Sequence, residues 1–232
     1  RGDIARAERL YQQALAIQEK LAPNSLEVAI TLHSLGNVAY TRGDIARAEQ
    51  LLQQVLAIQE KLAPNSLVVA KTLNNLTAVA LSRGDIARAE QLLQQVLAIQ
   101  EKLAPNSLLT APTLQTLGAV AYDRGDLSGA EQLLQQALAI QEKLAPNSLE
   151  VAGMLADLGT VVLSRGDLSG AEQLYQQALA IQEKLAPNSL EVAITLHSLG
   201  NVAYTRGDIA RAERLYQQAL AIQEKLAPNS LE

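Results

Sequence analysis

Few residue types in this chain of 232 residues could carry out chemistry. It has two histidines and no cysteine, which excludes thiol catalysis, disulfide bonds and cysteine-ligated metals. It has no HExxH, GxSxG or glycine-rich phosphate-binding motif, and no serine stands in a pattern that suggests a paired base. We therefore predict that the chain is not an enzyme and that it holds no cofactor and no metal.

The motif Arg-Gly-Asp suggests an adhesion function at first sight, but its recurrence favours a structural one. It begins at Arg1, Arg42, Arg83, Arg124, Arg165 and Arg206, always 41 residues apart. At each place the glycine can end one helix and the aspartate can cap the next. A fixed period of this size is typical of solenoids, propellers and arrays, whose repeats bury their apolar faces against one another.

The two histidines, His33 and His197, occupy equivalent positions four repeats apart. In an extended array they could not meet at one metal ion. We therefore interpret both as surface or groove residues.

Two amphipathic helices are predicted in each repeat. After Asp44, apolar residues recur every three or four positions as far as Leu62, and Pro64 cannot continue a helix. This pattern predicts a helix of about 18 residues, helix B, with Asp44 as its N-cap.

The other helix, helix A, begins after Asn24 and Ser25, which we interpret as a capping pair. Its apolar face is carried by Val28, Leu32 and neighbouring positions, and Gly43 ends it. No segment alternates with period two, so no strands are expected. The predicted fold is all-α, a solenoid of antiparallel helix pairs over residues 1–232 as one domain. Its repeats start near residues 1, 42, 83, 124, 165 and 206; the first begins with helix B and the last is partial.

The signature Leu32-x-x-Leu35-Gly36-x-x-x-Tyr40, followed by Gly43-Asp44, Ala48, Leu52 and Val55, resembles the tetratricopeptide repeat. The long helix B and the run 57–64 look like the kinesin-light-chain type of that repeat. HEAT and armadillo repeats share the length but lack the Leu-Gly and Gly-Asp pairs. The resemblance implies a right-handed superhelix that binds a protein or an extended peptide in a concave groove lined by helix A.

Helix B is nearly identical in all repeats, whereas helix A varies at five positions that fall on one face. The resemblance places these positions in the groove; the alternative is that they are surface positions that have drifted freely, with recent duplication explaining the constant helix B. The candidate binding residues are Ile30, His33, Asn37, Tyr40, Thr41, Lys71, Asn74, Ala78, Leu81, Gln115, Tyr122, Asp123, Thr160, His197, Asn201 and Tyr204.

The chemistry of this face is mild. Lys71 is its one cation and Asp123 its one anion, and amides and hydroxyls make up much of the rest. Amide side chains both donate and accept, so they can hold the main chain of an extended peptide. We therefore expect weak selection for charge.

Composition excludes other classes of partner. A net charge of −5 argues against nucleic acid, which needs clustered basic residues. Residues 103–122 are uncharged but contain polar and turn-forming residues, so no membrane span is expected. The lack of cysteine fits a cytoplasmic location. Because the chain begins with Arg1 and its one methionine is Met154, we expect it to be part of a longer protein.

Two further expectations concern particular segments. Residues 206–232 repeat residues 1–27, which leaves a helix B unpaired at each end. Head-to-tail self-association into a longer superhelix is therefore the alternative function. In the third repeat Pro112 would break a helix that began after Ser107, so we expect a later start with Thr110 as its cap. With Gly153 in the next repeat, the middle of the groove should be locally irregular.

Overall fold

The computed structural model describes residues 2–227, which form eleven helices and no strand. The helices are α1 (Gly2–Leu21), α2 (Leu26–Thr41), α3 (Ile45–Leu62), α4 (Leu67–Ser82), α5 (Ile86–Leu103), α6 (Thr110–Asp123), α7 (Leu127–Leu144), α8 (Leu149–Ser164), α9 (Leu168–Leu185), α10 (Leu190–Thr205) and α11 (Ile209–Leu226). Even-numbered helices are the predicted helix A and odd-numbered ones helix B. The all-α prediction is confirmed.

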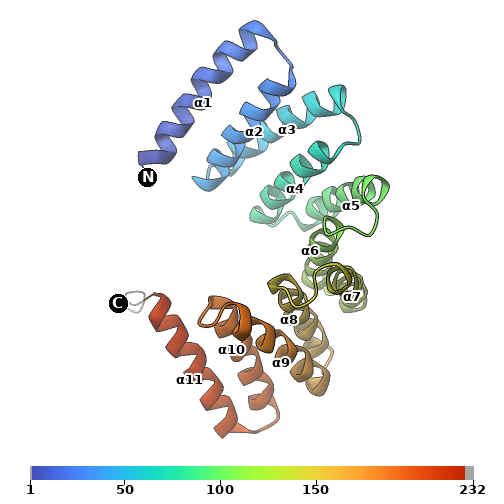
Figure 1. Ribbon diagram of the computed structural model, residues 1–232, viewed down its shortest axis with the longest axis vertical. Coiled ribbons are helices and arrows are strands. Elements are labelled where there is room, and N and C mark those ends of the chain that lie inside the picture. The colour runs from blue at the N-terminus through green and yellow to red at the C-terminus, as the bar shows by residue number, and fades with distance from the viewer. Residues whose placement is uncertain (1, 228–232) are drawn as a thin grey trace. The chain divides into compact units, whose positions relative to one another are not determined.

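The chain forms two compact parts, residues 1–105 and residues 106–232. In the first part α2 packs against α3 and α4 against α5; in the second the hairpins are α6–α7, α8–α9 and α10–α11 (Figure 1). Within each part the hairpins are joined by the contacts α1–α2, α3–α4, α7–α8 and α9–α10. The expectation of an unpaired helix B at each end was wrong for the last repeat, because α11 packs against α10. The single continuous array over residues 1–232 stays a prediction.

The core of each part consists of small and branched apolar residues on facing helices. Ala48, Leu52 and Val55 of α3 are at most 1% exposed and pack against α2 and α4. A Cβ at Gly36 would lie only 3.1 Å from Cγ of Leu52, so glycine permits the close approach of α2 and α3.

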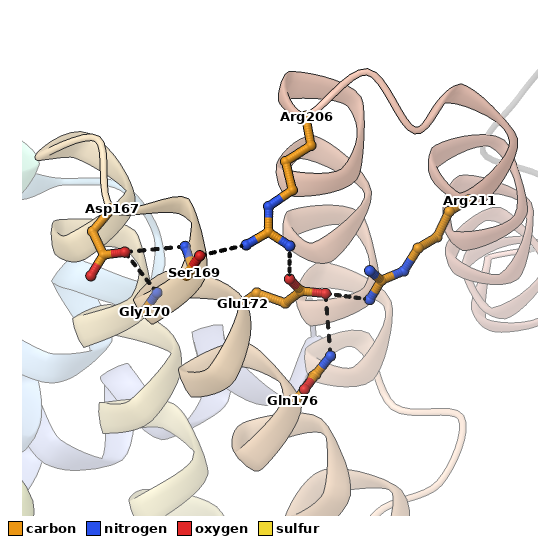
Figure 2. Close-up of polar contacts among 7 residues, drawn as sticks. All are labelled: Asp167, Ser169, Gly170, Glu172, Gln176, Arg206 and Arg211. Atoms are coloured by element: carbon orange, nitrogen blue, oxygen red, sulfur yellow. Dashed lines mark hydrogen bonds and ion pairs between the residues drawn. The ribbon is translucent and has the colours of Figure 1, made fainter.

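The turn from helix A to helix B follows the sequence prediction. Gly43 has a φ of +81°, and the Asp44 N–H donates to the Ala39 carbonyl at 2.9 Å, the hydrogen bond that closes a Schellman motif. The Asp44 side chain accepts from the Arg47 N–H and caps α3. Asp167 caps α9 in the same way (Figure 2). Glycine and aspartate of the Arg-Gly-Asp motif are therefore structural residues.

The arginine of the motif links neighbouring repeats, which the sequence did not reveal. Arg206 forms an ion pair with Glu172 of the preceding helix B and donates to the Ser169 hydroxyl at 2.9 Å (Figure 2). Arg211 approaches the other oxygen of Glu172 at 2.6 Å. The same kind of pair joins Arg42 to Glu8, Arg83 to Glu49 and Arg165 to Glu131.

The connector from helix B to helix A differs from the prediction in one residue. Ser25 is the N-cap of α2, and its hydroxyl accepts from the Val28 N–H at 3.3 Å. Asn24 does not cap; it adopts the left-handed conformation with φ +59°, which asparagine tolerates better than most residues. Its counterparts in the other connectors, Asn65, Asn106, Asn147 and Asn188, do the same.

Helix α6 starts late, as predicted for the repeat that contains Pro112. It has 14 residues where its counterparts have 16, and Pro112 is its third residue, in the first turn, where a missing N–H is tolerated. The predicted cap was wrong: Thr110 is the first helical residue and its hydroxyl donates to the Ser107 carbonyl. Helix α8 continues through Gly153 without a break, so the irregularity is confined to α6.

The uncharged stretch 103–122 is divided between the end of α5, a connector and α6. Within residues 2–227, no helix combines the length and the apolar character that crossing a bilayer requires.

Candidate functional site

The predicted binding residues lie on helix A, on a face that is largely exposed. Eleven of the sixteen are exposed, and the other five, His33, Ala78, Leu81, Gln115 and Tyr122, are half-buried. Ile30 is 66% exposed and Tyr204 62%, although both are large and apolar or aromatic. None of the sixteen is in the core, so this face is available to a partner.

In the N-terminal part several of these residues line one cavity. It has a volume of about 350 Å³ and lies between α2 and α4, with Ile30, His33, Asn37 and Lys71 in its wall. Its wall also contains Ser34, Val68, Thr72 and Gln59. A neighbouring cavity of about 390 Å³, lined by residues of α1 and α2, again includes Asn37 together with Thr41.

Gln59 is a helix B residue that the sequence analysis did not assign to the groove. It is buried, and its Oε1 accepts from the Thr72 hydroxyl at 2.7 Å. Gln59 therefore forms a polar floor beneath the variable side chains of α2 and α4. It was missed because glutamine recurs at this position in every repeat, and constancy alone gave no reason to separate it from the surface glutamines nearby.

His33 is held by amides from two repeats. The Asn75 amide lies 2.7 Å from Nε2 of His33 and donates 3.1 Å to Oδ1 of Asn37. Burial, with the nearby positive charge of Lys71, lowers the pKa of His33 below its ordinary value. A neutral ring can accept at Nε2, so this hydrogen bond and the lowered pKa favour the same state. Asn75 was not among the predicted site residues.

In the C-terminal part the equivalent contact pairs an amide with a carboxylate. Gln115 of α6 donates to Oδ2 of Asp157 of α8 at 2.6 Å. Asp157 is half-buried, and burial raises its pKa while the Gln115 hydrogen bond opposes that shift. Asp157 was also missed, because the sequence analysis considered the position of His33 in each repeat but not the position that follows it. In successive repeats this following position is occupied by Ser34, Asn75, Thr116, Asp157 and Ser198.

Tyrosine hydroxyls make a second series of contacts between helices. Those of Tyr40 and Tyr122 each lie 2.9 Å from the Oγ of a serine on the next helix A, Ser82 and Ser164 respectively. The Tyr175 hydroxyl is 3.0 Å from that of Thr160. In the last repeat the Tyr216 hydroxyl donates to Asn201 at 2.7 Å, and its ring packs against that of His197.

Seven of the predicted residues are held in place by such contacts. His33, Asn37, Tyr40, Gln115, Tyr122, Thr160 and Asn201 are oriented by side-chain hydrogen bonds within the protein. Ile30 and Lys71 are exposed and line the cavity between α2 and α4. Among residues 2–227 no group of three or more histidine and carboxylate side chains is placed to hold a metal ion.

Two larger cavities lie at the connectors between helix B and helix A in the N-terminal part. They measure about 510 and 550 Å³ and are lined by matching residues one repeat apart, such as Pro23 and Pro64 or Lys61 and Lys102. Because their linings are the same in both repeats, they offer no variation along the chain. The variable face of helix A does.

Helical hairpins repeated every 41 residues, each with an accessible polar face on its first helix, define an α-solenoid repeat protein. The model of the tetratricopeptide repeat family matches residues 1–61, 68–143 and 147–225, and the chain belongs to that family. The resemblance to its kinesin-light-chain type is also confirmed. A search of the curated proteins found no match.

Solved structures with the same fold include BtubC (BKLC) from P. vanneervenii, with a TM-score of 0.83 and 20% identity over 96% of this chain and 92% of that chain. A putative kinesin light chain from Podosopora anserina with nearly identical TPR-like repeats gives a TM-score of 0.70 and 28% identity over 84% of this chain and 95% of that one. Rap protein complexed with Competence and Sporulation Factor gives 0.68 and 16% identity, over 94% and 64%. The chain is therefore a tetratricopeptide repeat scaffold, a kind of protein consistent with interaction rather than catalysis.

Proposed function

We propose that the chain binds an extended peptide or a peptide segment of a protein along the exposed face of helix A, without catalysis. The observation that carries this proposal is the cavity between α2 and α4, whose wall contains four of the predicted residues, Ile30, His33, Asn37 and Lys71. Positions in its wall vary between repeats, whereas helix B is nearly constant. A binding site specific for one sequence requires such variation, because identical repeats would bind every segment alike.

Amide side chains are the proposed contacts to the peptide main chain. Asn74 is exposed, and Asn37 and Gln115 are oriented by neighbouring side chains. An amide has two donor hydrogens and an acceptor oxygen, so Asn37 and Gln115 retain capacity for a ligand beyond the bonds they already make. Their orientation before binding reduces the entropy lost when a peptide is held.

A peptide selected from a phage-displayed random library against the whole chain supplies the test ligand. Replacing Asn37, Asn74 and Gln115 by alanine should abolish its binding, measured by isothermal titration calorimetry. The matched control replaces Gln54, Gln95 and Gln136, three exposed amides of helix B, and should bind normally. Unchanged affinity in the first variant, with its circular dichroism spectrum intact, would defeat the proposal.

Head-to-tail self-association is the second candidate. Leu10 and Ile17 of α1 are 57% and 59% exposed, whereas Ile58, which corresponds to Ile17 in α3, is 8% exposed. A second copy that covered them would remove apolar surface from water. Light scattering should then show concentration-dependent association, and a strict monomer at high concentration would count against it.

A further inference from the structure

Asp157 differs from four partly buried glutamates of helix B in having no cationic partner. Glu8, Glu49 and Glu172 each contact two arginines, and Glu131 contacts one. Their side chains are 11–23% exposed, so each charge that is largely removed from water is compensated. Asp157 is half-buried, and among the residues that the structure describes no lysine, arginine or histidine forms an ion pair with it.

The two groups that the structure shows interacting with Asp157, Gln115 and Tyr175, are polar but uncharged. Gln115 donates one hydrogen bond to its Oδ2. The Tyr175 hydroxyl is close enough to interact electrostatically with both Asp157 and Tyr122, and it lies 3.0 Å from the Thr160 hydroxyl. These hydroxyls accept as well as donate, and the Gln115 amide oxygen is a further acceptor. The surroundings therefore orient the carboxylate but do not neutralise it.

We infer that Asp157 is the anchor for a cationic side chain, arginine or lysine, of the bound peptide. The inference rests on the proposed peptide-binding function and adds to it the charge of the ligand at this position. A carboxylate partly removed from water and lacking a counter-ion gains more from a cation than an exposed carboxylate does. An arginine can meet the carboxylate with two N–H groups and direct the others to hydroxyl acceptors.

Asp157 is better placed to select charge than Asp123, the one anion among the predicted binding residues. Asp123 is exposed, so solvent screens any attraction it exerts, whereas Asp157 is half-buried and fixed by Gln115. In the N-terminal part, by contrast, Lys71 lines the cavity between α2 and α4 and disfavours a cation there. The two parts of the chain would accordingly prefer different residues of a ligand.

The direct test is an NMR titration of the uniformly ¹⁵N-labelled full chain with N-acetyl-arginine amide. N-acetyl-citrulline amide, which is neutral and nearly the same shape, is the control probe, and N-acetyl-lysine amide is a second cation. The side-chain amide of Gln115 reports binding because it touches Asp157. We expect saturable shifts with the two cations and an affinity about tenfold lower for the citrulline compound.

The variants are Asp157→Asn and, as the matched control, Asp123→Asn. In Asp157→Asn the oxygen can still accept from Gln115, so the fold should persist while the preference for arginine over citrulline is lost. Removing an uncompensated charge should also raise the Tm of Asp157→Asn, an effect that an aspartate needed for folding would not give. Asp123→Asn should keep the preference. Equal shifts with citrulline, or an unchanged preference in Asp157→Asn, would overturn the inference.

Failure of the inference is distinguishable from failure of the proposed function. If library-selected peptides bind the chain but bind Asp157→Asn equally well, the inference falls and peptide binding stands. If the library yields no peptide and the arginine amide shifts nothing, both fall. A selected peptide whose single arginine is required, and whose affinity drops in Asp157→Asn but not in Asp123→Asn, supports both.

Discussion

Single carboxylates and their arginines hold neighbouring repeats together. The Glu172 side chain is 13% exposed and contacts both Arg206 and Arg211 (Figure 2). We predict that replacing both arginines by alanine lowers the free energy of unfolding by about 1–3 kcal/mol, less than the full cost of an unpaired buried charge because the arginines are about a third exposed. Urea denaturation measures the change. The control is Arg214→Ala, whose guanidinium donates to a carbonyl of its own helix; an equal loss there would contradict the prediction.

The protonation of His33 gives a prediction about how stability depends on pH. Burial and the charge of Lys71 lower its pKa, so we expect it to titrate below 6.5 in an NMR experiment. Lys71→Gln should raise this pKa only part of the way back, because burial, the larger cause, remains. As the pH falls below the ordinary value, the unfolded chain binds a proton that the folded chain resists, so the stability contributed by His33 decreases. A pKa at or above 6.5 in the wild-type protein would refute this account.

At the scale of the helix, glycine has opposite roles at two positions of α8. At Gly159 a Cβ would come within 2.9 Å of the buried Tyr175 ring, whereas at Gly153 its nearest neighbour is the Gln115 amide at 3.7 Å. We predict that Gly159→Ala destabilises the protein by about 1–3 kcal/mol and that Gly153→Ala stabilises it by about 0.5–1 kcal/mol. Thermal unfolding of the two variants tests this, and effects of the same sign would contradict it.

The helices and their limits were predictable because the signals are local. Gly43, Asp44, Ser25 and Pro64 mark helix ends within a few residues, and the apolar spacing shows which face is buried. Pro112 likewise predicted the late start of α6. The apolar spacing also predicted which face of helix A is exposed, and the variation between repeats indicated which positions on that face to consider.

The contacts between repeats were not predictable from these signals. The partners of Arg206 and Gln115, Glu172 and Asp157, lie 34 and 42 residues away in the chain. Whether such residues meet depends on how one hairpin stacks on the next, which no local pattern encodes. For the same reason Asn75 was missed, although it contacts His33 in the wall of the cavity between α2 and α4. Gln59, which contacts Thr72 there, was missed because its position is constant.

In the molecule as a whole, the constant parts of the repeats build the scaffold, and we propose that the variable face of helix A binds the ligand. The cavities at the connectors are larger than the cavity between α2 and α4, but their linings are the same from one repeat to the next. A ligand bound there would meet the same surface at successive positions. A ligand bound on helix A meets Lys71 in one repeat and Gly153 in another, which permits a defined register.

Isoleucine methyl NMR can show whether the ligand binds helix A or helix B, because the chain has only two isoleucines on helix A, Ile30 and Ile194, which are 66% and 53% exposed. Exposed isoleucines of helix B, Ile17 at 59% and Ile209 at 55%, are internal controls. On addition of the library-selected peptide we predict that the methyl signal of Ile30 or Ile194 shifts while those of Ile17 and Ile209 do not. Shifts confined to the helix B isoleucines would show that the ligand does not bind the variable face of helix A.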